Sequence, residues 1–204
     1  DAQESRGLGD VYKRQGWDEG SIVAREVATL AEGCGCAAIT LHPRTRAQGY
    51  AGRADWGLLA QVVQAVSIPV WASGDVRSID DARRCLAETG CAGLMIGRGA
   101  LHNPWILAQI AAALAGQNPV SVGPAERYRF LNNYLELLTQ EMPHEAAILG
   151  KVKALVGRMH LGLPGTTALR QQVMRSHSLA EVRRLMAEYF SSWSREGGQI
   201  GGVP

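Results

Sequence analysis

The chain has 204 residues, of which 46% are hydrophobic and 20% are charged. This composition is typical of a folded globular protein and excludes a disordered chain, a collagen and a disulfide scaffold. No run of about 18 apolar residues is present, which excludes a membrane-spanning helix, and the N-terminal residues lack the apolar segment of a signal peptide. The net charge of +2 is too small to indicate a nucleic-acid partner by itself.

The four cysteines carry little functional information. In the absence of a signal peptide they indicate a reducing compartment, so we expect a cytoplasmic protein. Cys34 and Cys36 form a C-x-C pair, but no second pair of Cys or His follows at zinc-finger spacing. We therefore expect small buried thiols and no metal site.

The first half of the chain alternates predicted helices with predicted strands. Apolar residues at helical spacing predict helices over residues 23–31, 55–66 and 78–88. Short, solidly apolar runs predict strands over residues 37–41, 68–72 and 91–96. Short connections between alternating strands and helices favour parallel strands, so the first half is predicted to be an α/β domain.

The second half shows no strand pattern. Helical spacing predicts helices over residues 104–115, 124–141, 145–161, 166–175 and 179–190. A segment rich in Gly and Pro at 116–123 is the predicted linker. We therefore expect an α/β domain over 16–116, a helical domain over 117–190 and a flexible tail over 191–204.

Unusual polar residues follow the predicted strands of the α/β domain. In parallel α/β folds, ligands bind beyond the carboxyl ends of the strands. Glycines let backbone amides approach an anion, and an arginine supplies a permanently charged fork suited to phosphate. We predict a phosphate or a phosphorylated cofactor there, although each Gly-Asp or Gly-Arg pair alone could be a tight turn. The residues concerned are His42, Ser73, Gly74, Asp75, Gly97 and Arg98.

Cations gather in two stretches that contain no acidic residue. The loop over 42–54 holds Arg44, Arg46 and Arg53, which could contact a polyanion or simply lie in solvent. The segment 146–180 also lacks Asp and Glu and resembles a surface that tracks phosphates. Its cations are Lys151, Lys153, Arg158, Arg170 and Arg175.

Three ordered motifs, at residues 40–50, 68–75 and 95–105, together resemble those of the tRNA-dihydrouridine synthase family of bacterial type. Residues 40–50, T-L-H-P-R-T-R-A-Q-G-Y, are similar to the family pattern T-x-H-x-R-T-R-x-x-x-Y. Residues 68–75, I-P-V-W-A-S-G-D, resemble I-P-V-x-x-N-G-D, with Ser73 where the family usually has Asn. Residues 95–105, M-I-G-R-G-A-L-H-N-P-W, resemble the family's M-I-G-R-[GA]-A segment and the P-W that follows it. The likeness extends over about residues 16–190.

The resemblance implies the C-terminal part of a (β/α)₈ TIM barrel followed by an all-α helical bundle that binds tRNA. It implies an FMN enzyme that uses NADPH to reduce uridine in tRNA to dihydrouridine. The strand-end residues named above would contact FMN, and Arg44 and Arg46 would face the RNA. Lys151, Lys153, Arg158 and Arg170 would belong to the tRNA-binding surface, and the protein is expected to be a monomer.

The chain lacks parts that the family requires. Only three strands are clear, and they resemble the last three of the barrel, so the strands carrying the family's general-acid cysteine are absent and no catalytic residue is assigned. Residues 11–17, V-Y-K-R-Q-G-W, resemble V-K-x-R-x-G-W, but Lys13 lies one position late and is not assigned as the flavin lysine. Residues 8–15, L-G-D-V-Y-K-R-Q, resemble adapter sequence, and residues 1–15 are expected to be non-native or disordered.

Two other interpretations remain open at this point. The chain could be part of another FMN-dependent TIM-barrel oxidoreductase acting on a small molecule, similar to dihydroorotate dehydrogenase. It could also be a non-catalytic RNA-binding helical module. In the first interpretation, as an incomplete synthase, we expect the chain alone to be unstable and inactive.

Overall fold

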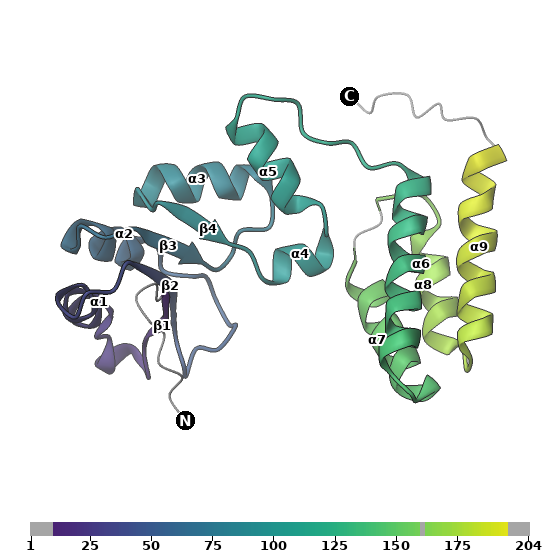
Figure 1. Ribbon diagram of the computed structural model, residues 1–204, viewed down its shortest axis with the longest axis horizontal. Helices are drawn as coiled ribbons and strands as arrows, with labels where there is room; N and C mark the ends of the chain where they lie inside the picture. Colours follow the sequence, from purple (N-terminus) through teal and green to yellow (C-terminus); the bar gives the residue numbers. More distant parts are fainter. Residues whose placement is uncertain (1–9, 160–161, 196–204) are drawn as a thin grey trace. The chain divides into compact units, whose positions relative to one another are not determined.

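The computed structural model describes residues 10–159 and 162–195, and it divides into two compact units (Figure 1). The first unit holds the described residues up to Ala100 together with Ile106–Pro119. The second holds Leu101–Trp105 and the described residues from Val120 onward. The units are therefore considered one at a time.

A parallel sheet organises the first unit. Among the described residues it has four strands in the order β1-β2-β3-β4, and each strand pairs in parallel with the next. Thr40, Trp71 and Gly93 lie side by side at one level of the sheet. Because all the pairs are parallel, the carboxyl ends of the four strands lie at one edge of the sheet. The strands are β1 (Asp10–Gly16), β2 (Ala38–Thr45), β3 (Val70–Ser73) and β4 (Gly93–Met95).

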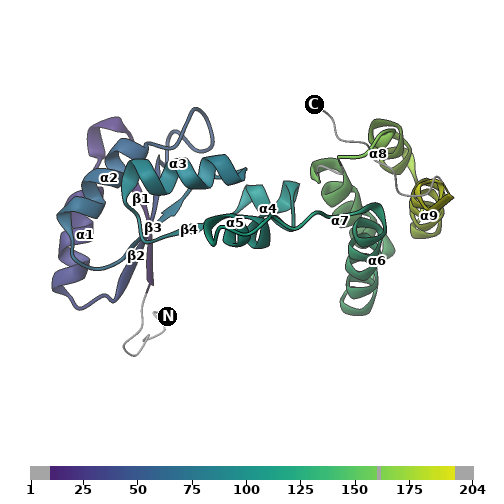
Figure 2. The same ribbon diagram turned by 90° about the horizontal axis from the view of Figure 1, so that it is seen from above.

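Apolar stripes place the helices of this unit against the sheet. Ile39 and Leu41 of β2 are buried in one core with residues of α1 (Ala24–Gly33), α2 (Trp56–Ala65), α3 (Ile79–Thr89) and α5 (Ile106–Leu114). Figure 2 shows α1, α2 and α3 together on the same side of the sheet. The side chains of Asp55 and Ser78 cap the first turns of α2 and α3 by accepting backbone N–H groups.

The sheet differs from the sequence prediction in two respects. Residues 10–16 form a fourth strand, so the expected count of three is too low and the segment predicted as non-native or disordered contains β1. Residues 1–9 lie outside the described residues. The second difference is the length of β2, which continues to Thr45 instead of ending at Leu41. Pairing with β1 alone, at His42 and Thr45, extends it beyond Leu41 into the segment that polarity alone assigned to a loop; the pairing with β3 ends at Leu41.

The helices of the second unit pack around a separate apolar core. α6 contacts α7 and α9, and α8 contacts α7 and α9. Leu135, Val152, Val173 and Met186 come from different helices and are almost wholly inaccessible to solvent. The elements are α6 (Pro124–Glu141), α7 (Glu145–Arg158), α8 (Thr166–Arg175) and α9 (Leu179–Arg195). The short helix α4 (Arg98–His102) begins in the first unit and ends in the second.

Two boundaries differ from expectation. α9 continues to Arg195, whereas the helix was predicted to end at residue 190; residues 196–204 of the predicted tail lie outside the described residues. Leu101–Trp105 belongs to the helical unit because Trp105 packs on Phe130, with ring centroids 5.3 Å apart. No described helix is long and apolar enough to cross a membrane.

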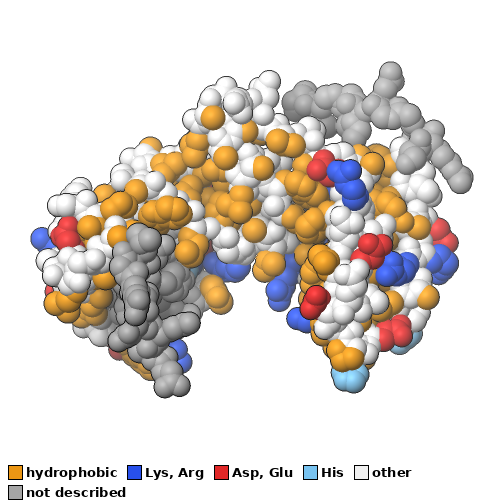
Figure 3. Space-filling model, in the orientation of Figure 1, with side chains coloured by type: hydrophobic (Ala, Val, Ile, Leu, Met, Phe, Trp, Pro, Cys, Tyr) orange, Lys and Arg blue, Asp and Glu red, His pale blue; other side chains and the backbone are white. Residues whose placement is uncertain are grey.

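The sheet leaves apolar side chains exposed. Trp71 of β3 and Met95 of β4 are each about two-fifths exposed, at 42% and 41%. Figure 3 shows hydrophobic side chains spread over the part of the unit where Figure 1 draws β4 and α5. Parallel sheets are normally covered on both faces, so this open sheet fits a larger fold that the described residues do not complete.

Candidate functional site

The loops beyond the carboxyl ends of β2, β3 and β4 enclose a cavity of about 130 Å³. The structure brings all six residues predicted to bind a cofactor into its wall, from segments far apart in the sequence. Tyr50 and Arg77 also line the cavity and were not predicted, although Tyr50 closes the first motif and Arg77 lies two residues after Asp75. The lining residues are His42, Tyr50, Ser73, Gly74, Asp75, Val76, Arg77, Met95, Gly97, Arg98 and Gly99.

The turn after β3 is shaped by Gly74 and His42. The His42 ring is buried, and its Nδ1–H donates to the carbonyl oxygen of Ser73 over 2.6 Å. Gly74 has a φ of 138°, and a Cβ at this position would lie 3.2 Å from His42 Nδ1. A side chain there would therefore meet both backbone strain and a close contact. Glycine lets the backbone of the turn lie directly against the imidazole.

Asp75 is the electrostatic centre of the pocket. Its Oδ2 accepts hydrogen bonds from Arg44 Nη2 at 2.6 Å and from the Ala54 backbone N–H at 2.7 Å. Its Oδ1 accepts a hydrogen bond from Arg98 Nη2 at 3.3 Å and lies 3.7 Å from Arg77 Nη2. One carboxylate thus joins three arginines that come from β2, from the turn after β3 and from α4.

The surroundings of Asp75 favour its charged form. Burial raises the pKa of this carboxyl, but the hydrogen bonds from Arg44 and Ala54 and the charges of Arg44 and Arg77 lower it by more. The resulting pKa lies below the ordinary value of 3.8. Asp75 is therefore a fixed negative charge at neutral pH.

Arg98 reaches the cavity between an acid and an aromatic ring. Its guanidinium lies 4.4 Å from the centroid of the Tyr50 ring and also contacts Asp75. The side chain remains 36% exposed, so it can still meet a ligand. Three arginines face a single carboxylate here, and the excess positive charge suits a phosphate group.

Arg44 does not lie where the sequence prediction placed it. It was expected to face RNA, but its side chain is fully buried, because β2 extends through it and the following loop covers it. Besides Asp75, its Nη2 donates to the Gly52 carbonyl oxygen at 3.0 Å. Arg44 therefore acts inside the pocket wall and is withdrawn as an RNA contact.

Two residues of the helical unit that were predicted to contact RNA form hydrogen bonds with backbone carbonyls at helix ends. Lys153 Nζ donates to the carbonyl oxygen of Ser176, the residue that ends α8, over 2.7 Å. Arg170 donates to the carbonyl oxygens of Val156 and Met159 at the end of α7. Cations at helix C-termini satisfy carbonyls that lack partners within the helix. These hydrogen bonds hold both side chains at helix ends, so we do not propose them as RNA contacts.

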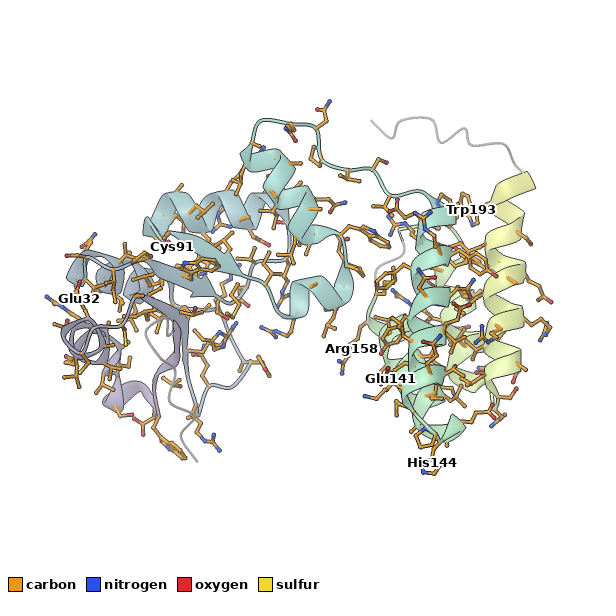
Figure 4. All side chains as sticks on the ribbon, in the orientation of Figure 1. Glu32, Cys91, Glu141, His144, Arg158 and Trp193 are labelled. Carbon is orange, nitrogen blue, oxygen red and sulfur yellow. The ribbon has the colours of Figure 1, made fainter. Side chains whose placement is uncertain are left out.

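The remaining predicted RNA contacts are exposed. Arg46 follows β2 and lies 5.0 Å from the centroid of the exposed Trp17 ring. Lys151 and Arg158 are exposed on α7, and Figure 4 shows Arg158 at one end of this helix and His144 at the other. Over α6 and α9, by contrast, Figure 3 shows acidic and basic side chains interspersed.

None of the cysteines lines the cavity. Cys91 lies two residues before β4 and is buried, as is Cys85 on α3. Cys34 follows α1, and Cys36 precedes β2, so both lie toward the amino ends of the strands. Cys34 is exposed and Cys36 is half-buried, so the expectation of buried thiols is wrong for this pair. No group of His, Cys, Asp and Glu that could hold a metal ion occurs among the described residues.

Comparison with known proteins agrees with the motifs. The chain is 40% identical over 182 residues to a probable tRNA-dihydrouridine synthase of Rhodobacter capsulatus; the match covers 87% of this chain and 54% of that protein. A probable tRNA-dihydrouridine synthase 1 of Synechocystis is 36% identical, with 89% of this chain and 51% of the relative covered. The chain thus spans about half the length of these curated relatives.

The family described as dihydrouridine synthase matches residues 10–193, which include β1, the whole cavity wall and the described helices of the second unit except the last two residues of α9. The match begins inside the segment that was expected to be foreign. It also contains all three motifs that follow the strands. The chain therefore belongs to the dihydrouridine synthase family.

Proposed function

We propose that this chain is part of a flavin-dependent enzyme that reduces uridine in tRNA to dihydrouridine, with NADPH as the reductant. The observation that carries the proposal is the cavity beyond β2, β3 and β4, where the family motifs meet around a cluster of arginines. The relatives named as tRNA-dihydrouridine synthases supply the reaction class. NADPH rests on the resemblance alone.

The cavity fits the phosphate end of FMN. A Cβ on Gly74 would lie 3.2 Å from His42 Nδ1, a close contact, and a Cβ on Gly99 would collide with the Val76 carbonyl oxygen at 2.6 Å. These glycines leave backbone close to the cavity, while Arg98 and Arg77 supply positive charge. A phosphate monoester is the group that such a wall recognises.

The residues of this chain would bind and orient the cofactor, and FMN when bound would supply hydride transfer to the uracil ring. His42 holds the turn after β3 through the Ser73 carbonyl. Arg98, kept in place by Tyr50 and Asp75, would fix the cofactor phosphate. The resemblance places the family's general-acid cysteine on strands that this chain does not show. We therefore expect this chain alone to lack synthase turnover.

On the RNA side, we propose Arg46, Lys151 and Arg158 as phosphate contacts. All three are exposed, and no carboxylate forms an ion pair with them among the described side chains. Exposed cations without a fixed acidic partner can neutralise RNA phosphates and release counterions.

Flavin binding tests the proposal directly. Titration of the chain with FMN and with riboflavin, followed by flavin fluorescence, should show tighter binding of FMN because only FMN carries a phosphate. Arg98→Ala should weaken FMN binding by roughly tenfold or more, the usual effect of losing a charge-assisted hydrogen bond. Arg83→Ala, an exposed residue of α3, is the matched control and should bind FMN as before. Equal affinity for FMN and riboflavin would contradict the proposed site.

A further inference from the structure

Arg44 occupies a position that stability alone does not explain. Its side chain is fully buried, and only Nη2 is hydrogen-bonded, to Gly52 and Asp75. Within the described part of the chain, Nε and Nη1 are buried without a hydrogen-bond partner. A buried ion pair that is incompletely satisfied is often no more stabilising than apolar side chains of the same size. We therefore look for the role of Arg44 in the groups that its guanidinium holds in place.

Arg44 holds one side of the Asp75 carboxylate. Oδ2 receives both Arg44 and the Ala54 N–H, whereas Oδ1 faces Arg98 and Arg77 at the cavity. Asp75 has a φ of 57°, and it is the one residue other than glycine with a positive φ among those described. Asp adopts this conformation more readily than most residues, yet at some energetic cost. The buried side chain of Arg44 is well placed to keep Asp75 in this positive-φ conformation.

The same contacts hold the loop after β2 in place. Arg44 binds the Gly52 carbonyl, Asp75 binds the Ala54 N–H, and Tyr50 lies over Arg98. The buried end of this network is Arg44, and its exposed end is Arg98. A change at Arg44 would therefore be transmitted to the cavity through a single carboxylate.

We propose that Arg44 is a positioning residue for phosphate binding: it anchors Asp75, which in turn orients Arg98 and Arg77 toward the cavity. Arg44 itself would not touch the ligand. The inference rests on the proposed function, because it assumes that the cavity takes a phosphate group. It adds that the affinity of the cavity for phosphate depends on the guanidinium of Arg44, which is buried beneath the cavity wall, and not only on the positive charge at the surface of that wall.

The test compares variants of the full chain that keep or change the charge of this cluster. Arg44→Met combined with Asp75→Asn removes the anchor but leaves the net charge of Arg44, Asp75, Arg77 and Arg98 unchanged. Binding of inorganic phosphate is measured by calorimetry, and folding by thermal unfolding. Arg83→Met with Asp80→Asn removes an exposed ion pair of α3, 3.9 Å long, and serves as the control.

If Arg44 positions Asp75, the double variant should keep its unfolding temperature but bind phosphate roughly tenfold more weakly, while the control binds normally. Phosphate affinity equal to that of the unaltered chain would overturn the inference and leave the proposed function standing. Failure of the unaltered chain to bind either phosphate or FMN would overturn both.

A second variant decides the matter if the double variant does not fold. Asp75→Asn retains Arg44, and Asn tolerates a positive φ. Charge alone predicts tighter phosphate binding, because a negative charge leaves the pocket. Positioning predicts weaker binding, since Arg98 and Arg77 lose the carboxylate that orients them. The sign of the change therefore distinguishes the two explanations, and tighter binding would refute ours.

Discussion

Individual residues of the cavity wall are constrained by backbone geometry as much as by charge. Gly74 has a positive φ and lies against His42, whereas Gly97, in the same wall, has open space where a Cβ would stand. The two glycines look alike in sequence, each preceding a charged residue at a strand end. Their different surroundings give them different tolerance to substitution.

Gly74→Ala should lower the free energy of unfolding by about 1–3 kcal/mol, the usual cost of forcing a side chain into a strained backbone region. Gly97→Ala should change it by less than about 0.5 kcal/mol, because nothing lies within 4 Å of the added carbon. Urea unfolding of both variants measures the difference. Equal effects would show that the turn after β3 relaxes around the new methyl group.

The lowered pKa of Asp75 gives a pH dependence with a defined sign. A carboxyl whose pKa is lower in the folded state stabilises the fold above its unfolded value, near 3.8. This stabilisation is lost as the pH falls through the folded-state pKa. Asp75→Asn should therefore remove part of the loss of stability below about pH 4. Unfolding midpoints from pH 7 to 3 measure it, and an unchanged acid profile would argue against the Arg44–Asp75 pair.

At the scale of elements, basic side chains of the helical unit donate hydrogen bonds to the last carbonyls of its helices. Lys153 and Arg170 reach from one helix to the last carbonyls of another, and both are partly buried. Lys151 and Arg158 on α7 are exposed. Cations of one acid-free stretch therefore divide into structural and surface residues, and spacing along the chain does not distinguish them.

Lys153→Met and Arg170→Met should each destabilise the protein by about 1–2 kcal/mol, because each leaves helix-end carbonyls without a donor. Lys151→Met and Arg158→Met should leave thermal unfolding nearly unchanged but weaken tRNA binding. Calorimetric unfolding and filter binding on the same four variants provide the comparison. A stability loss at Lys151 matching that at Lys153 would contradict this division of roles.

For the whole molecule, proposed RNA contacts occur in both units, Arg46 in the first and Lys151 and Arg158 in the second. Each phosphate that a cation neutralises contributes about 0.7–0.9 to the slope of log affinity against log salt concentration. Replacing all three by Gln should therefore reduce the slope for tRNA by about 2–3. The control replaces Arg83, Arg129 and Arg184, which pair with acids on their own helices. A slope equally reduced in the control would show a merely general charge effect.

The sequence by itself determined the parallel α/β unit, the helices that follow it and the six strand-end residues that meet at the cavity. It could do so because strand ends share one edge and periodicity reports local burial. It missed β1, whose apolar pattern is weak and whose strand is defined by pairing with β2. Only the tertiary structure decided that Arg44 lies beneath the cavity wall. It also decided that the side chains of Lys153 and Arg170 donate to carbonyls at the ends of other helices. A charged side chain carries no local signal of whether distant segments will cover it or leave it in water.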